Sequence, residues 1–294
     1  MNIAVLGHAE SWYVRRLQQA AQARGYHCEQ VDFRQLASAV WEAQTRIKSG
    51  SYALHRADAV IVRTMPPGSL EQVVYRMDAL QRLESQGILV LNSPKAIEAA
   101  VDKFLATSRL AASQIPTPRT CVCETEEDAL QAFEQLGRDV VVKPLFGAEG
   151  RGILRVSDPD LAQRVFRTLQ RTQSVLYVQE FIAHAGYDLR LLVLDGQVLG
   201  AMRRRNSNDF RTNVARQAVA EIYIASQHEQ NLAVQAAAAI GACFAGVDLL
   251  YDPVGTCLVI EVNGVPGWQA FERVTNIAVA DRLMDYLEKQ KTCP

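Results

Sequence analysis

The N-terminal third of the chain alternates between short apolar runs and amphipathic stretches. Helical periodicity covers residues 12–24 and 70–86, and a glycine, Gly25 or Gly87, follows each stretch and ends it. The apolar runs that predict strands are residues 2–6, 28–33, 59–63 and 88–91. Alternating strands and helices predict a parallel sheet covered on both faces. We expect an N-terminal α/β domain over residues 1–92.

The pattern becomes mixed after residue 92. Ser93 is a plausible N-cap with Pro94 at the first helical position, and this helix is expected to reach about residue 114. Strands are predicted at residues 121–123, 139–143, 152–156 and 175–179, with helices at 126–136, 158–169 and 229–241. The expected fold class is therefore α/β and α+β, with further lobes over residues 93–183 and 184–294.

A predicted hairpin near the C-terminus carries three polar side chains. Residues 246–251 and 257–263 are apolar strands joined by a turn at 252–255. This pairing can bring Asp248 beside Glu261 and Asn263, and those two leave an extended strand from one face. Carboxylate and amide oxygens suit Mg²⁺ better than zinc. The alternative is an ordinary hairpin with polar residues at its ends.

A lysine and a glycine-rich segment together indicate an anion site. Lys143 ends a buried strand, and Gly147, Gly150 and Gly152 follow it closely. Glycines allow a close approach of the backbone to a phosphate chain, and consecutive N–H groups can form an anion-binding concavity. The lysine precedes the glycines, so the segment is not a P-loop. A plain glycine hairpin remains the alternative, and Lys103 by itself reads as a surface charge.

Arginines are concentrated in one short segment. Five of them fall within residues 203–216, offset only by Asp209. This density favours a focused anion site in a chain that is otherwise nearly neutral. A mobile basic loop and a small RNA-binding patch are the alternatives, although Phe210 alone is available there for base stacking.

Composition excludes several protein classes. The formal charge is 31 minus 32, or −1, which argues against a nucleic-acid-binding surface over the whole protein. No apolar run approaches the roughly 20 residues of a membrane span, and the start lacks the features of a secretion signal. The six cysteines are scattered, with one C-x-C pair. We expect a cytoplasmic protein with reduced thiols.

Taken in order, these features resemble the ATP-grasp superfamily, and within it the RimK-like family of amino-acid ligases that attach glutamate to a carboxylate. The resemblance covers most of the chain. It implies an ATP-grasp fold, with an N-terminal parallel-sheet (pre-ATP-grasp) domain and two lobes that clasp ATP. The segments that carry it are Asp102-Lys103, Val142-Lys143-Pro144, Gly147 to Gly152, Gln179-Glu180-Phe181-Ile182, Asp188-Leu189-Arg190, Asp209-Phe210-Arg211-Thr212-Asn213, Gly246-Val247-Asp248-Leu249-Leu250 and Glu261-Val262-Asn263.

The resemblance assigns roles to individual residues. Lys103 and Lys143 would contact the ATP phosphates, with the glycine loop closing over them. Two Mg²⁺ ions, or Mn²⁺, would bind at Asp248, Glu261 and Asn263. The remaining assignments are Gln179, Glu180, Phe181, Ile182 and Asp188 to the nucleotide, Arg190, Arg204 and Arg211 to the transferred phosphoryl group, and Asn213, Arg216 and Trp268 to the substrate.

The implied reaction passes the γ-phosphoryl group to a substrate carboxylate and then joins the acyl phosphate to an amine. Two departures from the family pattern bear on the acceptor. The segment Ala215-Arg216-Gln217-Ala218 replaces His-Arg-Gly-Gly, and Gly264-Val265-Pro266-Gly267-Trp268 replaces a Ser-Ser-Pro-Gly tail. Trp268 is free to stack on a flat ring or to pack against the sheet.

The Val-Pro-Gly-Trp variant resembles relatives that add L-glutamate to a pterin or another C1-carrier coenzyme. The expected partners are thus a small-molecule acceptor and L-glutamate, without membrane and without nucleic acid. A protein or peptide C-terminus as acceptor is one alternative, and a non-catalytic ATP-binding protein is another. Family members are often homodimers or homotetramers.

Overall fold

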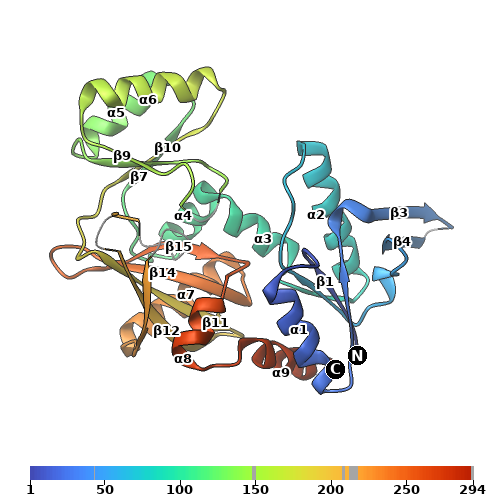
Figure 1. Cartoon of the computed structure of the whole chain (residues 1–294). Coiled ribbons are helices and arrows are strands. Elements are labelled where there is room, and N and C mark those ends of the chain that lie inside the picture. The colour runs from blue at the N-terminus through green and yellow to red at the C-terminus, as the bar shows by residue number, and fades with distance from the viewer. Residues whose placement is uncertain (43, 148–149, 207–208, 212–217, 293–294) are drawn as a thin grey trace.

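The computed structural model describes residues 1–42, 44–147, 150–206, 209–211 and 218–292. Figure 1 shows the N-terminal sheet on one side of the molecule, with the two later sheets and their helices on the other. Of the helices in these described ranges, none is both long and apolar enough to cross a membrane. The residues that line the candidate site come from the two later sheets and from the helix that begins at Lys103.

The N-terminal sheet is parallel, with strand order β2-β1-β5-β6. Its central strands are fully covered because apolar residues such as Ile3 and Val60 face helices on both sides. The sequence did not predict the antiparallel hairpin that follows β2. The elements are β1 (Asn2–Leu6), α1 (Trp12–Ala23), β2 (His27–Val31), η1 (Phe33–Gln35), β3 (Leu36–Trp41), β4 (Gln44–Ser49), η2 (Leu54–Arg56), β5 (Ala59–Val62), α2 (Leu70–Ser85) and β6 (Leu89–Leu91).

The single helix expected after Ser93 is divided at Asp102. This residue has an extended backbone (φ −87°, ψ 104°) and ends α3 (Pro94–Val101). Its Oδ1 accepts a hydrogen bond from the Leu105 amide at 3.0 Å and so caps α4 (Lys103–Ala112). The break makes Lys103 the first residue of a new helix, directed at the glycine loop.

The middle sheet is antiparallel, with order β7-β10-β8-β9. Two helices cover one face, where Phe133 and Phe166 are buried (Figure 1). The elements are β7 (Thr120–Cys123), α5 (Glu126–Gln135), β8 (Val140–Lys143), β9 (Leu154–Val156), α6 (Pro159–Arg171) and β10 (Leu176–Glu180).

The third sheet is also antiparallel, with order β13-β12-β11-β14-β15. The Ala-rich helix α7 packs on β14 and β15, which form the hairpin expected from the sequence. The elements are β11 (Tyr187–Leu194), β12 (Gln197–Arg205), β13 (Val219–Tyr223), α7 (Gln227–Ile240), β14 (Phe244–Tyr251) and β15 (Cys257–Asn263).

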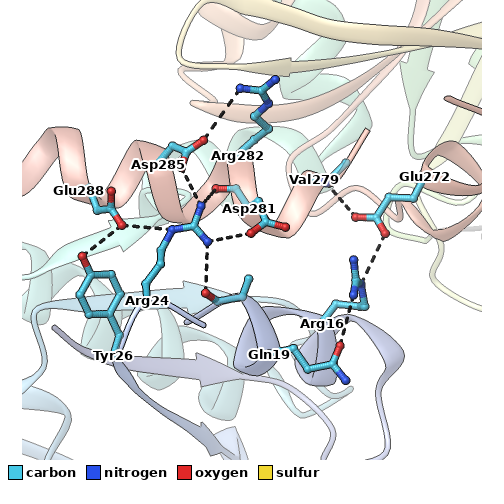
Figure 2. Close-up of polar contacts among 11 residues, drawn as sticks. Arg16, Gln19, Arg24, Tyr26, Glu272, Val279, Asp281, Arg282, Asp285 and Glu288 are labelled. Carbon is cyan, nitrogen blue, oxygen red and sulfur yellow. Dashed lines mark hydrogen bonds and ion pairs between the residues drawn. The ribbon is translucent and has the colours of Figure 1, made fainter. Parts of the chain in front are cut away.

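Of the last two helices, α8 (Gln269–Thr275) packs on β12 and β13 of the third sheet, and α9 (Val279–Thr292) packs on α1 of the N-terminal domain. Leu17 of α1 and Leu283 of α9 belong to one buried cluster. Figure 2 shows the polar contacts at the edge of the interface between α1 and α9, where Arg24 contacts three carboxylates of α9. Its ion pairs are with Asp281 at 2.7 Å, Asp285 at 2.8 Å and Glu288 at 3.2 Å.

Replacing Arg24 by Gln is expected to lower the free energy of unfolding by about 1–2 kcal/mol, because a network of ion pairs contributes more than one exposed pair. Urea unfolding measures the loss, which should shrink as salt screens the charges. The control is Arg138→Gln, which removes a single exposed pair with Glu134. Equal effects of the two substitutions would show that the network has no special weight.

Candidate active site

A cleft lies between the middle and third sheets, and most of the residues singled out from the sequence line it. They come from the ends of strands in both sheets and from the start of α4. The members of the predicted set that line the cleft are Lys103, Lys143, Gly147, Gly150, Gln179, Glu180, Phe181, Ile182, Asp188, Arg204, Arg211, Asp248 and Glu261.

Lys143 is held in the cleft by its neighbour on β10. Its Nζ donates to Gln179 Oε1 at 2.6 Å, while Gln179 Nε2 donates to Thr120 Oγ1 at 2.9 Å. Burial lowers the pKa of Lys143 to about 8, against the opposing influence of the Glu261 carboxylate. The ammonium group is thus held in one orientation. Without an anionic ligand, its charged form is only weakly favoured over the neutral amine.

Lys103 is tied to the glycine loop. Its Nζ donates to the carbonyl oxygens of Leu145 at 3.5 Å and Gly147 at 3.0 Å. Burial lowers its pKa too, opposed by Glu261 and Asp102. Gly152 has φ of 72°, and a Cβ there would lie 3.3 Å from Pro144 Cγ, so glycine is required at this bend. The start of the loop, at Leu145 and Gly147, is therefore held against Lys103.

We expect nucleotide binding to be accompanied by proton uptake above pH about 8, because a triphosphate favours the charged form of Lys143. In the unfolded chain Lys143 has its ordinary pKa of 10.5 and binds this proton more readily. The free energy of unfolding of the nucleotide-free protein therefore rises as the pH increases from about 8 to 10.5. Calorimetry in buffers of different ionisation enthalpy measures the uptake. It should diminish in Lys143→Met and persist in Lys289→Met, a surface control; unchanged uptake in Lys143→Met would contradict the assignment.

Two arginines and two aspartates form a buried charge cluster beside the lysines. Arg190 binds Asp248 through both carboxylate oxygens, at 2.7 and 2.6 Å. Arg204 contacts the same Asp248 at 2.9 Å and also pairs with Asp188. Burial would raise the pKa of Asp248, but the two guanidinium groups outweigh it and hold the pKa below its ordinary value. These arginines are fixed rather than free to swing.

The predicted metal ligands lie on adjacent strands. Asp248 is directly opposite Glu261, and Gly246 opposite Asn263. The register shifts beside this pair, so one extra residue, Ile260, is accommodated in β15 and both Ile260 and Glu261 line the cleft. The bulge thus turns the Glu261 carboxylate toward the lysines.

The side chains of Asp248, Glu261 and Asn263 differ in how many of their oxygens are available to a cation. Within the described ranges, Glu261 makes no hydrogen bond or ion pair, so its oxygens are available. Asn263 makes only a 3.4 Å contact through Nδ2 and keeps its amide oxygen, whereas Asp248 already accepts from two arginines. The described residues include no group of three or more His, Cys, Asp or Glu side chains that could hold a metal ion. Two carboxylates and an amide oxygen nevertheless fit a hard cation.

The arginine-rich segment is not a single site. Arg203 to Arg205 belong to β12, where successive side chains point to opposite faces. Arg204 is therefore buried in the cleft, while Arg203 pairs with Glu221 on the neighbouring strand at 2.6 Å. Arg211 lines the cleft but pairs with Asp209. Asn213 and Arg216 lie outside the described residues.

The ring of Trp268 follows the packing alternative rather than the stacking one. It is fully buried, and its ring packs edge-on against Tyr13 and Phe244, at centroid distances of 4.8 and 5.6 Å. The guanidinium carbon of Arg63 lies 4.2 Å from the centre of the same ring. No face of the indole is open to a flat substrate, so the packing alternative describes this structure.

Several cleft residues escaped the sequence analysis because they are ordinary apolar residues. Val141, Ile153, Leu250 and Ile260 line the same cleft as the charged groups. The Glu180 carboxylate is directed at Arg119, whose Nε donates to it at 2.6 Å. Residues 180–182 can therefore offer a ligand their backbone rather than the Glu180 carboxylate. For Leu250, the alternation of the strand was a signal that could have indicated which face it occupies. For Ile260 there was no such signal, because the bulge interrupts the alternation.

Comparison with known proteins adds to this geometry. The RimK-like ATP-grasp domain matches residues 100–287, and the RimK PreATP-grasp domain matches residues 1–97. The chain belongs to the RimK-like ATP-grasp family. The expected fold class and family are confirmed, and this RimK-like protein is a carbon–nitrogen ligase of the ATP-grasp type. The family uses ATP and Mg²⁺, and the alternative of a non-catalytic ATP-binding protein is set aside.

Named relatives span nearly the whole chain. The tetrahydromethanopterin:alpha-L-glutamate ligase of Methanosarcina acetivorans is 31% identical over 95% of this ligase and 96% of its own length. The ribosomal protein bS6--L-glutamate ligase of Salmonella paratyphi B is 32% identical over 99% and 97%. Among solved structures, the ATP-grasp ligase PsnB with minimal precursor, Mg and ADP has a TM-score of 0.77 at 23% identity, over 98% of this ligase and 96% of that chain. The last likeness concerns the fold alone.

Proposed function

We propose that this ligase adds L-glutamate to a carboxylate of a small-molecule coenzyme, such as a tetrahydropterin or a related C1 carrier, with ATP as the phosphoryl donor. The observation that carries the proposal is that Glu261 lines one cleft with Lys103 and Lys143 and lies opposite Asp248 on the neighbouring strand. The tetrahydromethanopterin relative, similar over nearly its full length, supports this acceptor class.

The reaction joins two anions before it joins carbon to nitrogen. A carboxylate oxygen attacks the γ-phosphorus, ADP leaves, and the amine then displaces phosphate from the acyl phosphate to form the amide. Lys103 and Lys143 would bind the phosphates of ATP. Two Mg²⁺ ions held by Asp248, Glu261 and Asn263, for which Mn²⁺ can substitute, would neutralise charge on the transferring group.

The remaining charged residues would act by position. Arg190 and Arg204 are held by Asp248 and Asp188, so their free N–H groups keep one direction as charge develops. The glycine loop, tied to Lys103 through Gly147, would cover the site and exclude water that hydrolyses the acyl phosphate.

A protein or peptide acceptor is the second candidate. The bS6-modifying relative favours it. In the described part of the chain, β13 is the outer strand of the third sheet, and Val219 and Ile222 on it are 61% and 63% exposed. An extended peptide adds to such an edge as one more strand.

The deciding experiment measures ADP formation with Mg²⁺ and ATP over amino acids crossed with acceptors. The acceptors are reduced pterins, furan-type C1 carriers and glutamate-ending peptides, and products are identified by mass. The proposal expects ADP formation that requires both L-glutamate and a coenzyme, with the mass gain of one or more glutamyl units. Turnover with peptides alone would favour the second candidate, and nucleotide binding without turnover on any pair would contradict both.

A further inference from the structure

Two buried N–H groups lie together without an acceptor where the N-terminal domain meets the third sheet. In the described part of the protein, Arg63 Nε and Trp268 Nε1 are the buried side-chain polar atoms that lack a hydrogen-bond partner. The guanidinium carbon of Arg63 lies 4.2 Å from the centre of the Trp268 ring, so both donors belong to one place. Buried donors are nearly always satisfied. An orphaned pair indicates an acceptor that comes from outside the chain.

Arg63 also carries a charge that no carboxylate balances. It is only 7% exposed, and its Nη2 donates to the carbonyl oxygen of Pro266 at 2.7 Å. Among the described residues it forms no ion pair. Burial lowers its pKa to about 10, so it remains charged at neutral pH. A buried cation without a counter-ion is costly, and an anionic ligand would remove that cost.

The position in the fold is one where ligands are commonly bound. Arg63 directly follows β5, and its amide donates to the Leu6 carbonyl at the end of β1. The sheet order β2-β1-β5-β6 makes β1 and β5 the neighbours from which the connections diverge. In open α/β sheets, the crevice at the carboxyl ends of such strands binds ligands. A Cβ at Gly7 would lie 3.3 Å from Arg63 Cβ, so glycine keeps this end uncrowded.

The same place adjoins the charge cluster of the cleft. Pro266, which accepts from Arg63, packs against Gly246, where a Cβ would lie 3.0 Å from Pro266 Cβ and 3.7 Å from Arg190 Cδ. Arg190 in turn binds Asp248. One layer of small residues therefore separates Arg63 from the groups assigned to the reaction.

We propose that Arg63, together with the indole N–H of Trp268, binds a carboxylate of one of the two ligation substrates. The inference rests on the proposed function, since the incoming glutamate and a glutamate-ending acceptor both carry this group. The rings of Trp268 and Tyr13 lie 4.2 and 4.8 Å from the guanidinium carbon and hold the guanidinium in place. A guanidinium with a fixed orientation is suited to a planar carboxylate.

The test follows the indole N–H signals by nuclear magnetic resonance. The protein has three tryptophans, Trp12, Trp41 and Trp268, and Trp268→Phe identifies the relevant signal. With Mg²⁺ and a non-hydrolysable ATP analogue present, L-glutamate and N-acetyl-L-glutamate are titrated separately. We expect a saturable shift of the Trp268 signal, while that of Trp41, on the distant hairpin, stays unchanged. A response to L-glutamate alone assigns the incoming amino acid, and a response to the acetylated compound assigns the acceptor end.

The matched pair of variants is Arg63→Gln and Arg76→Gln. Arg76 is likewise buried and likewise donates to a proline carbonyl, that of Pro66, at 2.8 Å. Arg63→Gln should weaken binding of the responding compound about 10-fold or more, with Arg76→Gln near wild type. If Arg63→Gln does not fold, calorimetry on Trp268→Phe, which keeps most of the packing, should still show weaker binding.

Absence of any Trp268 shift with both compounds would overturn the proposal and leave the two donors to a bound water. The readout is independent of turnover, so it separates this inference from the proposed function. In steady-state kinetics of an active wild type, Arg63→Gln should raise the KM of one substrate and change kcat much less. A lower kcat with both KM values unchanged would also count against a carboxylate-binding role.

Discussion

Replacing Glu261 by Gln is expected to lower the rate of ADP formation by on the order of 100-fold or more, with little change in the free energy of unfolding. The glutamine side chain has the same shape, and Glu261 makes no hydrogen bond or ion pair within the described residues. Its charge is therefore not needed for folding. Loss of that charge beside Lys103 and Lys143 removes a ligand from the proposed Mg²⁺ site.

The measurement combines steady-state ADP release, on the substrate pair found with the wild type, with urea unfolding. Glu134→Gln is the control, since this glutamate lies on α5 and pairs with Arg138 away from the cleft. It should change neither quantity appreciably. Wild-type turnover by Glu261→Gln would show that the metal assignment is wrong.

Asp248→Asn is expected to lower the free energy of unfolding by about 3–5 kcal/mol, the usual range for breaking a buried ion pair. Asp248 is 3% exposed and pairs with both Arg190 and Arg204. Without its charge, Arg204 keeps only Asp188, and Arg190 has no carboxylate partner among the described residues. Turnover should fall as well, because Arg190 loses the carboxylate that orients it.

Asp139→Asn is the matched control. Asp139 also binds an arginine through both oxygens, Arg155 at 2.8 and 2.6 Å, but this pair is about two-fifths exposed. Its loss should cost no more than about 1 kcal/mol. Urea unfolding of both variants gives the comparison, and equal losses would contradict the special weight of the buried cluster.

The sequence predicted those elements whose signals are local. The strand at residues 2–6 and the helix from residue 70 have clear periodicity and clear ends, and they form as expected. The hairpin β3–β4 was missed because its turn reaches φ of 51° at Glu42 without the usual Gly or Asn. The division of the helix at Asp102 was missed because an aspartate inside an apolar pattern does not reveal a cap.

The candidate site shows the same limit. Lys143 and Glu261 were found because their residue types and neighbours are unusual at strand ends. The pairing of Arg204 with Asp188 and Asp248 depends on three strands meeting in register, which one sequence does not determine. The choice between stacking and packing for the Trp268 ring depends on its tertiary neighbours Tyr13 and Phe244, which the sequence does not reveal. Arg63 carried no signal of its own, because an arginine after a strand is commonplace.

The return of α9 to α1 has a consequence for how the protein is made. Val14 and Leu17 near the N-terminus share a buried cluster with Leu283 and Leu287. On the ribosome, the apolar side of α1 emerges long before its covering helix, by roughly tens of seconds at ordinary rates of synthesis. A nascent chain therefore holds this surface open until α9 has been synthesised. Expression of residues 1–92 alone leaves it permanently uncovered, so chaperone demand and fragment solubility both depend on the last helix.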